Sequence, residues 1–394
     1  MNEHFISAEY IHNGHDFLES GSVLVISNDG IIKNILHANE IESSKIEFFN
    51  GIVCPGFVNT HCHLELSHLK NKIAQKSSLE NFIKDIEGMR SFNIEEIEAA
   101  ELEADKEMFN NGIVAVGDIC NTLDTYKIKL SSPIYYHNFL EVFAFNPSKA
   151  EKVYNKGLQH YNTFSQISKY NNSLTLHAPY SASTELINLV KEDCKINHSI
   201  LSIHNQESAA EDEMFIHKKG ILLERIKKFG NNTDVWNCPG TSALNFLSNK
   251  LNGLQTNIQW VHNTFTKKED IEYALTQGNK IYWCFCPNAN LYIENAIPNI
   301  PLFKSLDSAI TIGTDSLASN QTLSVLEELK TIQLKFPEIT TVNLLKWATH
   351  NGADFLKIKN QYGTLEIGKK PGINLIKNTK GAELRKDSVC KKLF

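Results

Sequence analysis

The sequence predicts an α/β protein, a (β/α)8 TIM barrel with a small composite β-sandwich domain. Three observations support this. Short apolar segments alternate with longer amphipathic ones through most of the 394 residues, a pattern typical of βα units around a parallel sheet. Eight such apolar segments can be counted, the number that builds this barrel. Short β-rich runs at both ends predict a composite domain of residues 1–54 plus 361–394, beside a barrel of residues 55–360.

The elements can be taken in order. The run SVLVISNDGIIKNILH holds two β-rich stretches around Asn28, Asp29 and Gly30, which is a hairpin-turn signal. The predicted barrel strands span residues 57–60, 113–118, 134–142, 174–177, 200–204, 258–262, 280–285 and 309–314. Amphipathic segments predict helices between and after them, at 94–110, 184–194, 323–334 and 341–356.

Composition excludes several classes of protein. Hydrophobic residues make up 42% and charged residues 21%, which is ordinary globular usage. The net charge of −6 and the pI near 6.2 give no basic footprint for nucleic acid or an anionic membrane. No apolar run approaches the roughly 20 residues of a membrane helix, and the N-terminus has no signal-peptide pattern. Eight scattered cysteines indicate reduced thiols and a cytoplasmic protein.

The first chemical signal is PGFVNTHCHLELSH, which places His61 and His63 directly after the first predicted strand. Alternate residues of a strand point to the same side, so two imidazoles at this spacing can reach one metal ion. Two surface histidines on a loop are the alternative. Placement after Pro-Gly and an apolar strand favours the metal site.

The second signal is HNQES, where His204 ends the fifth strand and Glu207 follows three residues later. Imidazole suits zinc or iron, and a nearby carboxylate that is not a ligand can transfer protons as a general base and acid. The alternatives are a hydrogen-bonded core histidine and a helix N-terminal acid.

The third signal is IGTDSLASN, which places Asp315 at the end of the eighth strand. Asp315 could be a fourth ligand that also holds the attacking water, or a cap of the following helix. His177 and His262 end the fourth and sixth strands. Either could orient the substrate or the attacking water, or be a buried structural histidine.

Taken together, these three signals indicate a single site. The carboxyl ends of the strands in such a barrel converge on one mouth, where the active site lies. His61, His63, His204 and Asp315 should therefore meet there with Glu207, although as many as 254 positions separate them in the chain.

At this point the sequence resembles a known group. PGFVNTHCH, HAPYSAS, HNQES, VHN, CPNAN and GTDSLASN stand in the order found in deaminases of the amidohydrolase superfamily. The group includes cytosine, guanine and methylthioadenosine/S-adenosylhomocysteine deaminases and the triazine chlorohydrolases. The resemblance covers about residues 20–380, and in HCHLELSHLK, GTDSLASNQTL and the long fifth-to-sixth connection the chain looks most like aminofutalosine deaminases.

The resemblance implies one divalent metal ion, zinc in the first place and iron as the alternative, on His61, His63, His204 and Asp315. It implies proton transfer by Glu207 and contact of His262 with the attacking group. The predicted catalytic residues are Glu207, His262 and Asp315, and the predicted substrate contacts are His177, Glu65 and Glu141. It also implies a small-molecule substrate and, as is common in the family, a homodimer.

Some features bear on the finer assignment. Binuclear relatives carry a lysine in the fourth strand, and SLTLHAP has none, which favours one metal. Glu141 reads as a buried, paired carboxylate near the site, although some amide-cleaving relatives use a glutamate of this strand as a ligand. CPNAN has Ala289 where serine is usual, and the connection 209–257 is long. Both would shape the substrate pocket.

The sequence thus predicts a hydrolytic deaminase of an amino-substituted heterocycle, such as an aminopurine nucleoside or aminofutalosine, that releases ammonia. Hydrolysis of a C–Cl or amide bond on the same metal site is the alternative within enzymes. A barrel that binds without catalysing is an alternative of another class, and the complete ligand set argues against it.

Overall fold

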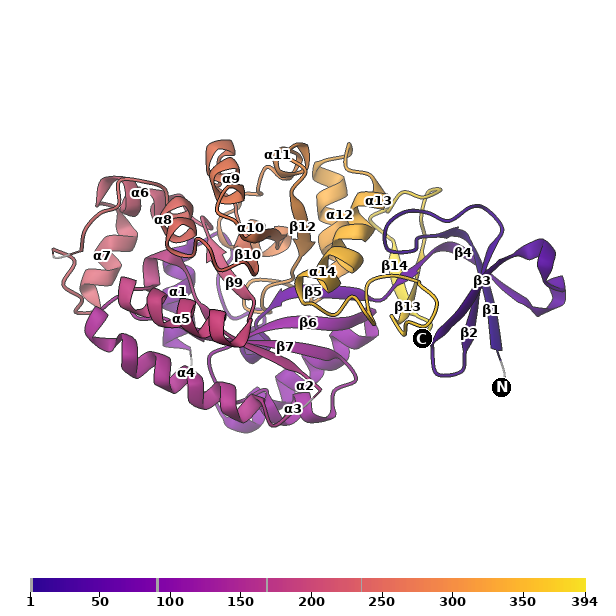
Figure 1. Ribbon diagram of the computed structural model, residues 1–394, viewed down its shortest axis with the longest axis horizontal. Helices are drawn as coiled ribbons and strands as arrows, with labels where there is room; N and C mark the ends of the chain where they lie inside the picture. Colours follow the sequence, from indigo (N-terminus) through magenta and orange to yellow (C-terminus); the bar gives the residue numbers. More distant parts are fainter. Residues whose placement is uncertain (1–2, 90–91, 168, 235) are drawn as a thin grey trace.

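The computed structural model describes residues 3–89, 92–167, 169–234 and 236–394. Strands and helices alternate around a central strand layer, and a separate sheet lies at one end of the molecule (Figure 1). Strands from both ends of the chain, indigo and yellow in the view, lie side by side in that sheet.

Eight parallel strands form two four-stranded sheets. Within each sheet the strands follow chain order, as successive βα units do. The first sheet holds β5 (Phe57–Cys62), β6 (Ile113–Cys120), β7 (Tyr135–Val142) and β8 (Asn171–Leu176). The second holds β9 (Leu201–Asn205), β10 (Asn257–His262), β11 (Lys280–Phe285) and β12 (Ala309–Ile312). All eight predicted strands are confirmed, and the parallel α/β architecture with them.

The two sheets meet at both of their edges. The backbone N–H of His204 in β9 donates to the carbonyl of His177, one residue past β8, at 2.9 Å. At the other seam, Thr314 N–H donates to the carbonyl of His61 at 3.0 Å, and Cys62 and Asp315 form an isolated parallel bridge. The carboxyl ends of the outer strands are therefore joined across both seams.

A buried polar layer links strands of both sheets. The Gln259 amide nitrogen donates to the Thr60 carbonyl and to the Ser202 hydroxyl, both at 3.1 Å. The Gln259 oxygen accepts from Thr311 Oγ1 at 2.8 Å. Because these groups satisfy one another, they can be buried at little cost. Thr60 precedes His61, so this layer supports the strand ends that carry the site.

Helices surround the strands. The predicted helix at 94–110 is present as α2 with these bounds, and Asn93 caps it by accepting from the backbone N–H of Glu95 at 3.1 Å. The predicted helix at 341–356 is interrupted by a π-turn at Trp347–Asn351. The helices are α1 (Leu79–Gly88), α2 (Ile94–Asn110), α3 (Tyr126–Ser131), α4 (Ala150–Phe164), α5 (Thr184–Asn197), α6 (Ala209–His217), α7 (Ile221–Lys228), α8 (Ala243–Lys250), α9 (Lys268–Leu275), α10 (Pro287–Ile293), α11 (Ile300–Ser305), α12 (Val325–Lys335), α13 (Thr341–Lys346) and α14 (Gly352–Phe355).

The terminal segments form one six-stranded sheet in the order β14-β13-β4-β1-β2-β3. Its members are β1 (Glu3–Ile11), β2 (Ser22–Ser27), β3 (Ile32–His37), β4 (Ile46–Pro55), β13 (Ile373–Lys377) and β14 (Val389–Lys392). The composite origin is as predicted, but the described residues form a single sheet where a two-layer sandwich was expected. The reason is that β4 pairs with β1 on one side and β13 on the other, which joins both ends of the chain in one ladder.

Among the described residues, no helix has the length and apolar character needed to cross a membrane.

Candidate metal and catalytic site

The predicted ligands gather where the strands end. His61 lies inside β5, while His63 lies one residue beyond it, at the start of a 3-10 turn. Gly313 makes room for this arrangement, because a Cβ at that position would lie 2.7 Å from His61 Cβ and 2.9 Å from the sulfurs of Cys284 and Cys286. Both cysteines are fully buried, so they are core thiols.

Four of the predicted side chains face one another. Asp315 Oδ1 lies 3.7 Å from His61 Nε2 and 3.5 Å from His63 Nε2. The Nε2 atoms of His63 and His204 are 3.2 Å apart. The structure thus brings together all four residues that the sequence proposed as metal ligands.

These side chains fit a metal ion. Both ring nitrogens of His61 are buried and have no hydrogen-bond partner among the described residues. Burial lowers the pKa of His61 and of His63 well below the ordinary value, so both rings are neutral and keep a free lone pair. Three imidazoles and one carboxylate are a donor set that zinc or iron accepts.

Neighbouring groups orient two of these residues. His204 Nδ1 lies 2.9 Å from the His177 carbonyl, which can only accept, so Nδ1 carries the proton and Nε2 faces the cluster. The Ser319 hydroxyl donates to Asp315 Oδ2, while Oδ1 faces the histidines. Asp315 has a left-handed backbone with φ of +56°, a strain that marks functional positions in many proteins.

Glu207 and His262 lie beside the four predicted ligands. Glu207 is buried in the turn between β9 and α6, and its Oε2 lies 3.6 Å from His262 Nε2. Burial, aided by the charge of Asp315, raises the pKa of Glu207 well above its ordinary value. A carboxyl with a raised pKa can both take up and release a proton near neutral pH. His262 Nδ1 lies 3.3 Å from the Asn290 side-chain amide, which fixes the ring.

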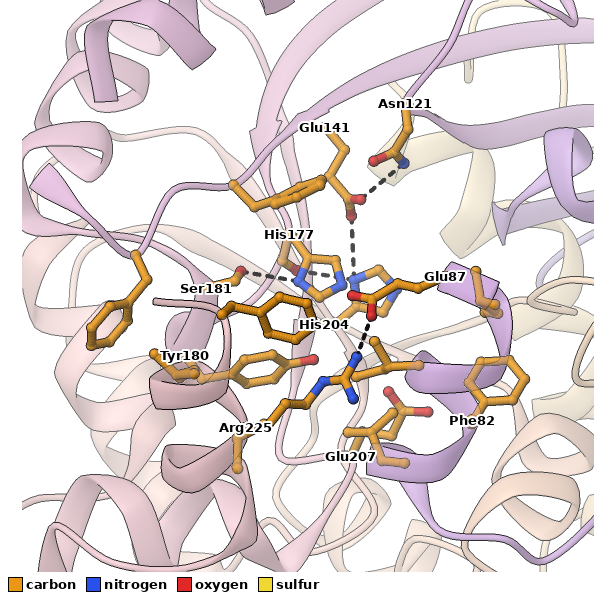
Figure 2. A pocket seen from close by; sticks show the side chains of 18 of the residues that line it. Phe82, Glu87, Asn121, Glu141, His177, Tyr180, Ser181, His204, Glu207 and Arg225 are labelled. Atoms are coloured by element: carbon orange, nitrogen blue, oxygen red, sulfur yellow. Dashed lines mark hydrogen bonds and ion pairs between the residues drawn. The ribbon is translucent and has the colours of Figure 1, made fainter. Parts of the chain in front are cut away.

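A cavity of about 530 Å³ opens from this cluster. Figure 2 shows His177, His204, Glu141 and Glu207 at its polar end and Tyr180 along its wall. Most of the remaining lining is apolar, from α1, α7 and the segment after β7. A polar reactive end and an apolar body are the usual composition of a small-molecule site.

The three predicted substrate contacts all line this cavity. His177 Nδ1 is hydrogen-bonded to Ser181 Oγ at 3.0 Å. Glu141 accepts from Asn121 Nδ2 at 3.0 Å, and its other oxygen lies 3.5 Å from His204 Nδ1. Glu65 accepts from Asn121 and Thr122, and burial raises its pKa to about 7.

The sequence interpretation missed the outer wall of the cavity. Arg225 of α7 reaches toward Glu87 of α1, and the two form an ion pair at 2.6 Å (Figure 2). Phe82 of α1 and Ile226 of α7 add apolar surface. The available signal was the long connection 209–257, which supplies α7, but no local pattern says that α7 turns back over the site.

Comparison with known proteins identifies the family of the chain. The amidohydrolase family matches residues 52–392. Among curated relatives, an aminodeoxyfutalosine deaminase of Nitratiruptor is 28% identical over 83% of this chain and 79% of its own. An adenosine deaminase of Helicobacter pylori is 25% identical over 84% and 80%. The solved aminofutalosine deaminase of Helicobacter pylori, in complex with methylthio-coformycin, has a TM-score of 0.82 at 22% identity, over 97% of this chain and 93% of that one. The chain belongs to the amidohydrolase family, whose fold is of the TIM-barrel type.

Proposed function

We propose that the protein is a metal-dependent hydrolase that deaminates the amino-substituted ring of an adenosine-like substrate and releases ammonia. The observation that carries this proposal is the meeting of His61, His63, His204 and Asp315 beside Glu207 in one cavity. The names of the relatives, an aminodeoxyfutalosine deaminase and an adenosine deaminase, support this substrate class.

One divalent ion fits the proposed site, and zinc is our first choice with iron as the alternative. The ligands would be His61, His63, His204 and Asp315. β8 contains no lysine that could bridge a second ion. When bound, the ion would lower the pKa of a water molecule to near neutrality and so supply the nucleophile.

The protein residues then have separate roles. Glu207 takes the proton of the attacking water at its carboxylate and delivers it to a ring nitrogen of the substrate. His262, whose Nε2 faces Glu207, orients the water, and Asp315 accepts from it. Addition of the water oxygen to the amine-bearing carbon gives a tetrahedral carbon. The remaining proton of the added hydroxyl passes to the amine with the help of Glu207 or Asp315, the C–N bond breaks, and ammonia leaves. His177, Glu65 and Glu141 hold or shape the substrate at the polar end of the cavity.

The proposal also covers the architecture of the protein, its cellular compartment and its oligomeric state. The two parallel sheets, joined at both seams, support a closed (β/α)8 barrel over residues 55–360, beside a terminal unit of residues 1–54 and 361–394. Eight free cysteines fit a reducing compartment, and the cytoplasm is our proposal. A homodimer stays a prediction.

The deciding experiment is ammonia release by zinc-loaded protein from a panel of aminofutalosine, methylthioadenosine, S-adenosylhomocysteine, adenosine, guanine and cytosine. We expect release from one of the adenine nucleosides. Release from none of them would contradict the proposal and favour C–Cl or amide hydrolysis at the same site.

Glu207→Gln tests the proton-transfer role. We expect it to keep stoichiometric zinc and to lose at least 100-fold in kcat, because general acid–base catalysis contributes about 10²–10⁴-fold. Glu213→Gln, on the exposed face of helix α6, which follows Glu207 in the chain, is the matched control and should keep full activity. An active Glu207→Gln enzyme would remove Glu207 from this role.

A further inference from the structure

A buried charge beside the strand ends has no part in the reaction proposed above. Lys129 of α3 is 0% exposed, and an unpaired ammonium in such a place would be very costly. Its Nζ lies 2.5 Å from Asp118 Oδ2 and donates to Asn138 Oδ1 at 2.7 Å. Burial by itself would lower the pKa of Lys129, but the charge of Asp118 outweighs it and holds that pKa above its ordinary value. The ammonium is therefore charged and paired.

The second oxygen of Asp118 has a different partner. Oδ1 accepts the backbone N–H of Leu64 at 2.9 Å, and Leu64 directly follows His63. Asp118 pairs with Cys62 in the β5–β6 ladder, so it lies beside the point where the chain leaves β5. β5 ends at Cys62, and His63, with φ −122° and ψ 81°, is therefore outside the strand ladder.

We propose that Asp118, held in place by Lys129, is a positioning residue for the metal ligand His63. The hydrogen bond to Leu64 fixes the backbone on the C-terminal side of His63. It thereby keeps His63 Nε2 directed at His204 Nε2 and Asp315 Oδ1, 3.2 and 3.5 Å away. This inference rests on the proposed metal site.

There is a physical reason why a charged pair, Asp118 with Lys129, holds this backbone position. A carboxylate is a stronger acceptor for a backbone N–H than a neutral group, but it can be buried at this depth only with a cation beside it. Lys129 supplies that cation from α3, on the side of Asp118 away from Leu64. Both partners are fully buried, so salt and water do not weaken the pair.

A purely structural role makes a different prediction. The pair also joins α3 to β6 and, through Asn138, to β7. If that were its only purpose, apolar side chains of similar size could replace it without affecting the metal site, as they do for other buried ion pairs. The positioning role requires an acceptor for Leu64, whatever its charge.

Two double variants separate these roles. Asp118→Asn with Lys129→Met removes both charges and keeps a carbonyl oxygen for Leu64. Asp118→Leu with Lys129→Met removes both charges and the acceptor. The measurements are the zinc dissociation constant by competition with a chromophoric chelator, the visible spectrum of the cobalt-substituted protein, and far-ultraviolet circular dichroism as a check of folding.

We expect the Asn/Met protein to bind zinc within about threefold of the wild type. The Leu/Met protein should bind about 10–100-fold more weakly, the usual effect of removing a group that orients a ligand, with an altered cobalt spectrum. Equal affinity of the two folded variants would overturn the inference. If the Leu/Met protein does not fold, Asp118→Ala with Lys129→Met replaces it under the same criterion.

The outcomes also separate this inference from the proposed function. If the wild-type protein binds zinc but deaminates no compound of the panel, the deaminase proposal is wrong and the proposed role of Asp118 is unaffected. Wild-type protein that binds no zinc would overturn both.

Discussion

At the proposed site, burial keeps several ionisable side chains neutral. His61 and His63 stay neutral because their desolvation disfavours the imidazolium form. Glu207 holds its proton to a higher pH for the same reason. The proposed metal ligands need free lone pairs, and the proposed proton carrier needs a pKa above that of an ordinary carboxyl. A single cause, removal from water, favours both.

At the scale of single residues, we expect that no larger side chain can replace Gly313 without disturbing His61. In Gly313→Ala the new methyl group would meet His61 Cβ at 2.7 Å. We expect zinc affinity to fall at least tenfold and the free energy of unfolding to fall by about 1–3 kcal/mol, as for other overpacked cores. Zinc competition and urea unfolding measure the two effects. Gly88→Ala is the control, since nothing lies within 4 Å of its Cβ, and a Gly313→Ala protein that matches it would refute the steric argument.

Glu101 of α2 should make stability depend on pH. It is fully buried, and neither of its carboxylate oxygens has a hydrogen-bond partner among the described residues. Burial first, then the charges of Asp124, Glu65 and Asp118, raises its pKa from 4.5 to about 8. The folded protein therefore keeps a proton that the unfolded chain releases. The stability from this group is full below pH 4.5 and is lost as the pH rises toward 8.

Glu101→Gln should abolish this dependence. Relative to the wild type, the free energy of unfolding of the variant should rise by up to about 1.4 kcal/mol per pH unit between pH 5 and 8. Urea unfolding at pH 5.5 and 7.5 measures this difference. Glu103→Gln, exposed on the same helix, should follow the wild-type slope. A parallel slope for Glu101→Gln would show that Glu101 carries no such proton.

At the scale of elements, α1 and α7 form a wall over the cavity. They come from separate connections, after β5 and after β9, and the Arg225–Glu87 ion pair joins them. A half-exposed pair of this kind contributes about 1 kcal/mol or less. The wall is therefore held mainly by its apolar side chains, Phe82, Leu222 and Ile226 among them.

Phe82→Ala should raise KM by about tenfold and leave kcat within about threefold. The ring offers apolar surface to the part of the substrate that does not react, and uniform binding of this kind affects KM alone. Steady-state kinetics on the best panel substrate measure the split. Phe48→Ala is the control, because Phe48 is 59% exposed on β4 of the terminal sheet and does not line the cavity. This variant should change neither constant. A fall in kcat alone would place Phe82 at the reacting centre.

At the scale of the whole molecule, the proposed metal site joins distant parts of the chain. His61 and Asp315 lie 254 positions apart in the sequence and meet across the seam between β5 and β12. A ligand that binds only the folded state stabilises it by mass action, by about 4 kcal/mol at a thousandfold excess over Kd.

Removal of the metal should therefore lower the thermal midpoint by several degrees without loss of the secondary structure. Calorimetry before and after dialysis against a chelator measures this, and added zinc should restore the midpoint. With the proposed ligand set, the Glu207→Gln protein should show the full shift in thermal midpoint, whereas the Asp315→Asn protein should show a smaller one. An unchanged thermal midpoint on metal removal would contradict the expectation that the bound ion stabilises the folded protein.

Much of the fold and site could be predicted from the sequence. The eight strands, helix α2 and the proposed ligands were located from hydrophobic period and from titratable residues at strand ends. These signals are local, because a strand and the residue at its end are encoded within a few positions. Their meeting at one mouth followed from the barrel topology, and the observed distances around Asp315 agree with it.

Other features were decided only by the tertiary structure. The sequence analysis assigned no role to Lys129, Asp118 or Arg225, because no local pattern distinguishes them from the other charged residues of the chain. The sequence predicted that both chain ends form one β-domain, but not that their strands join in a single six-stranded sheet. The sequence by itself determined the strands, the helices and the residues able to bind a metal. Which polar atom pairs with which depends on contacts between residues far apart in the chain, and only packing brings those together.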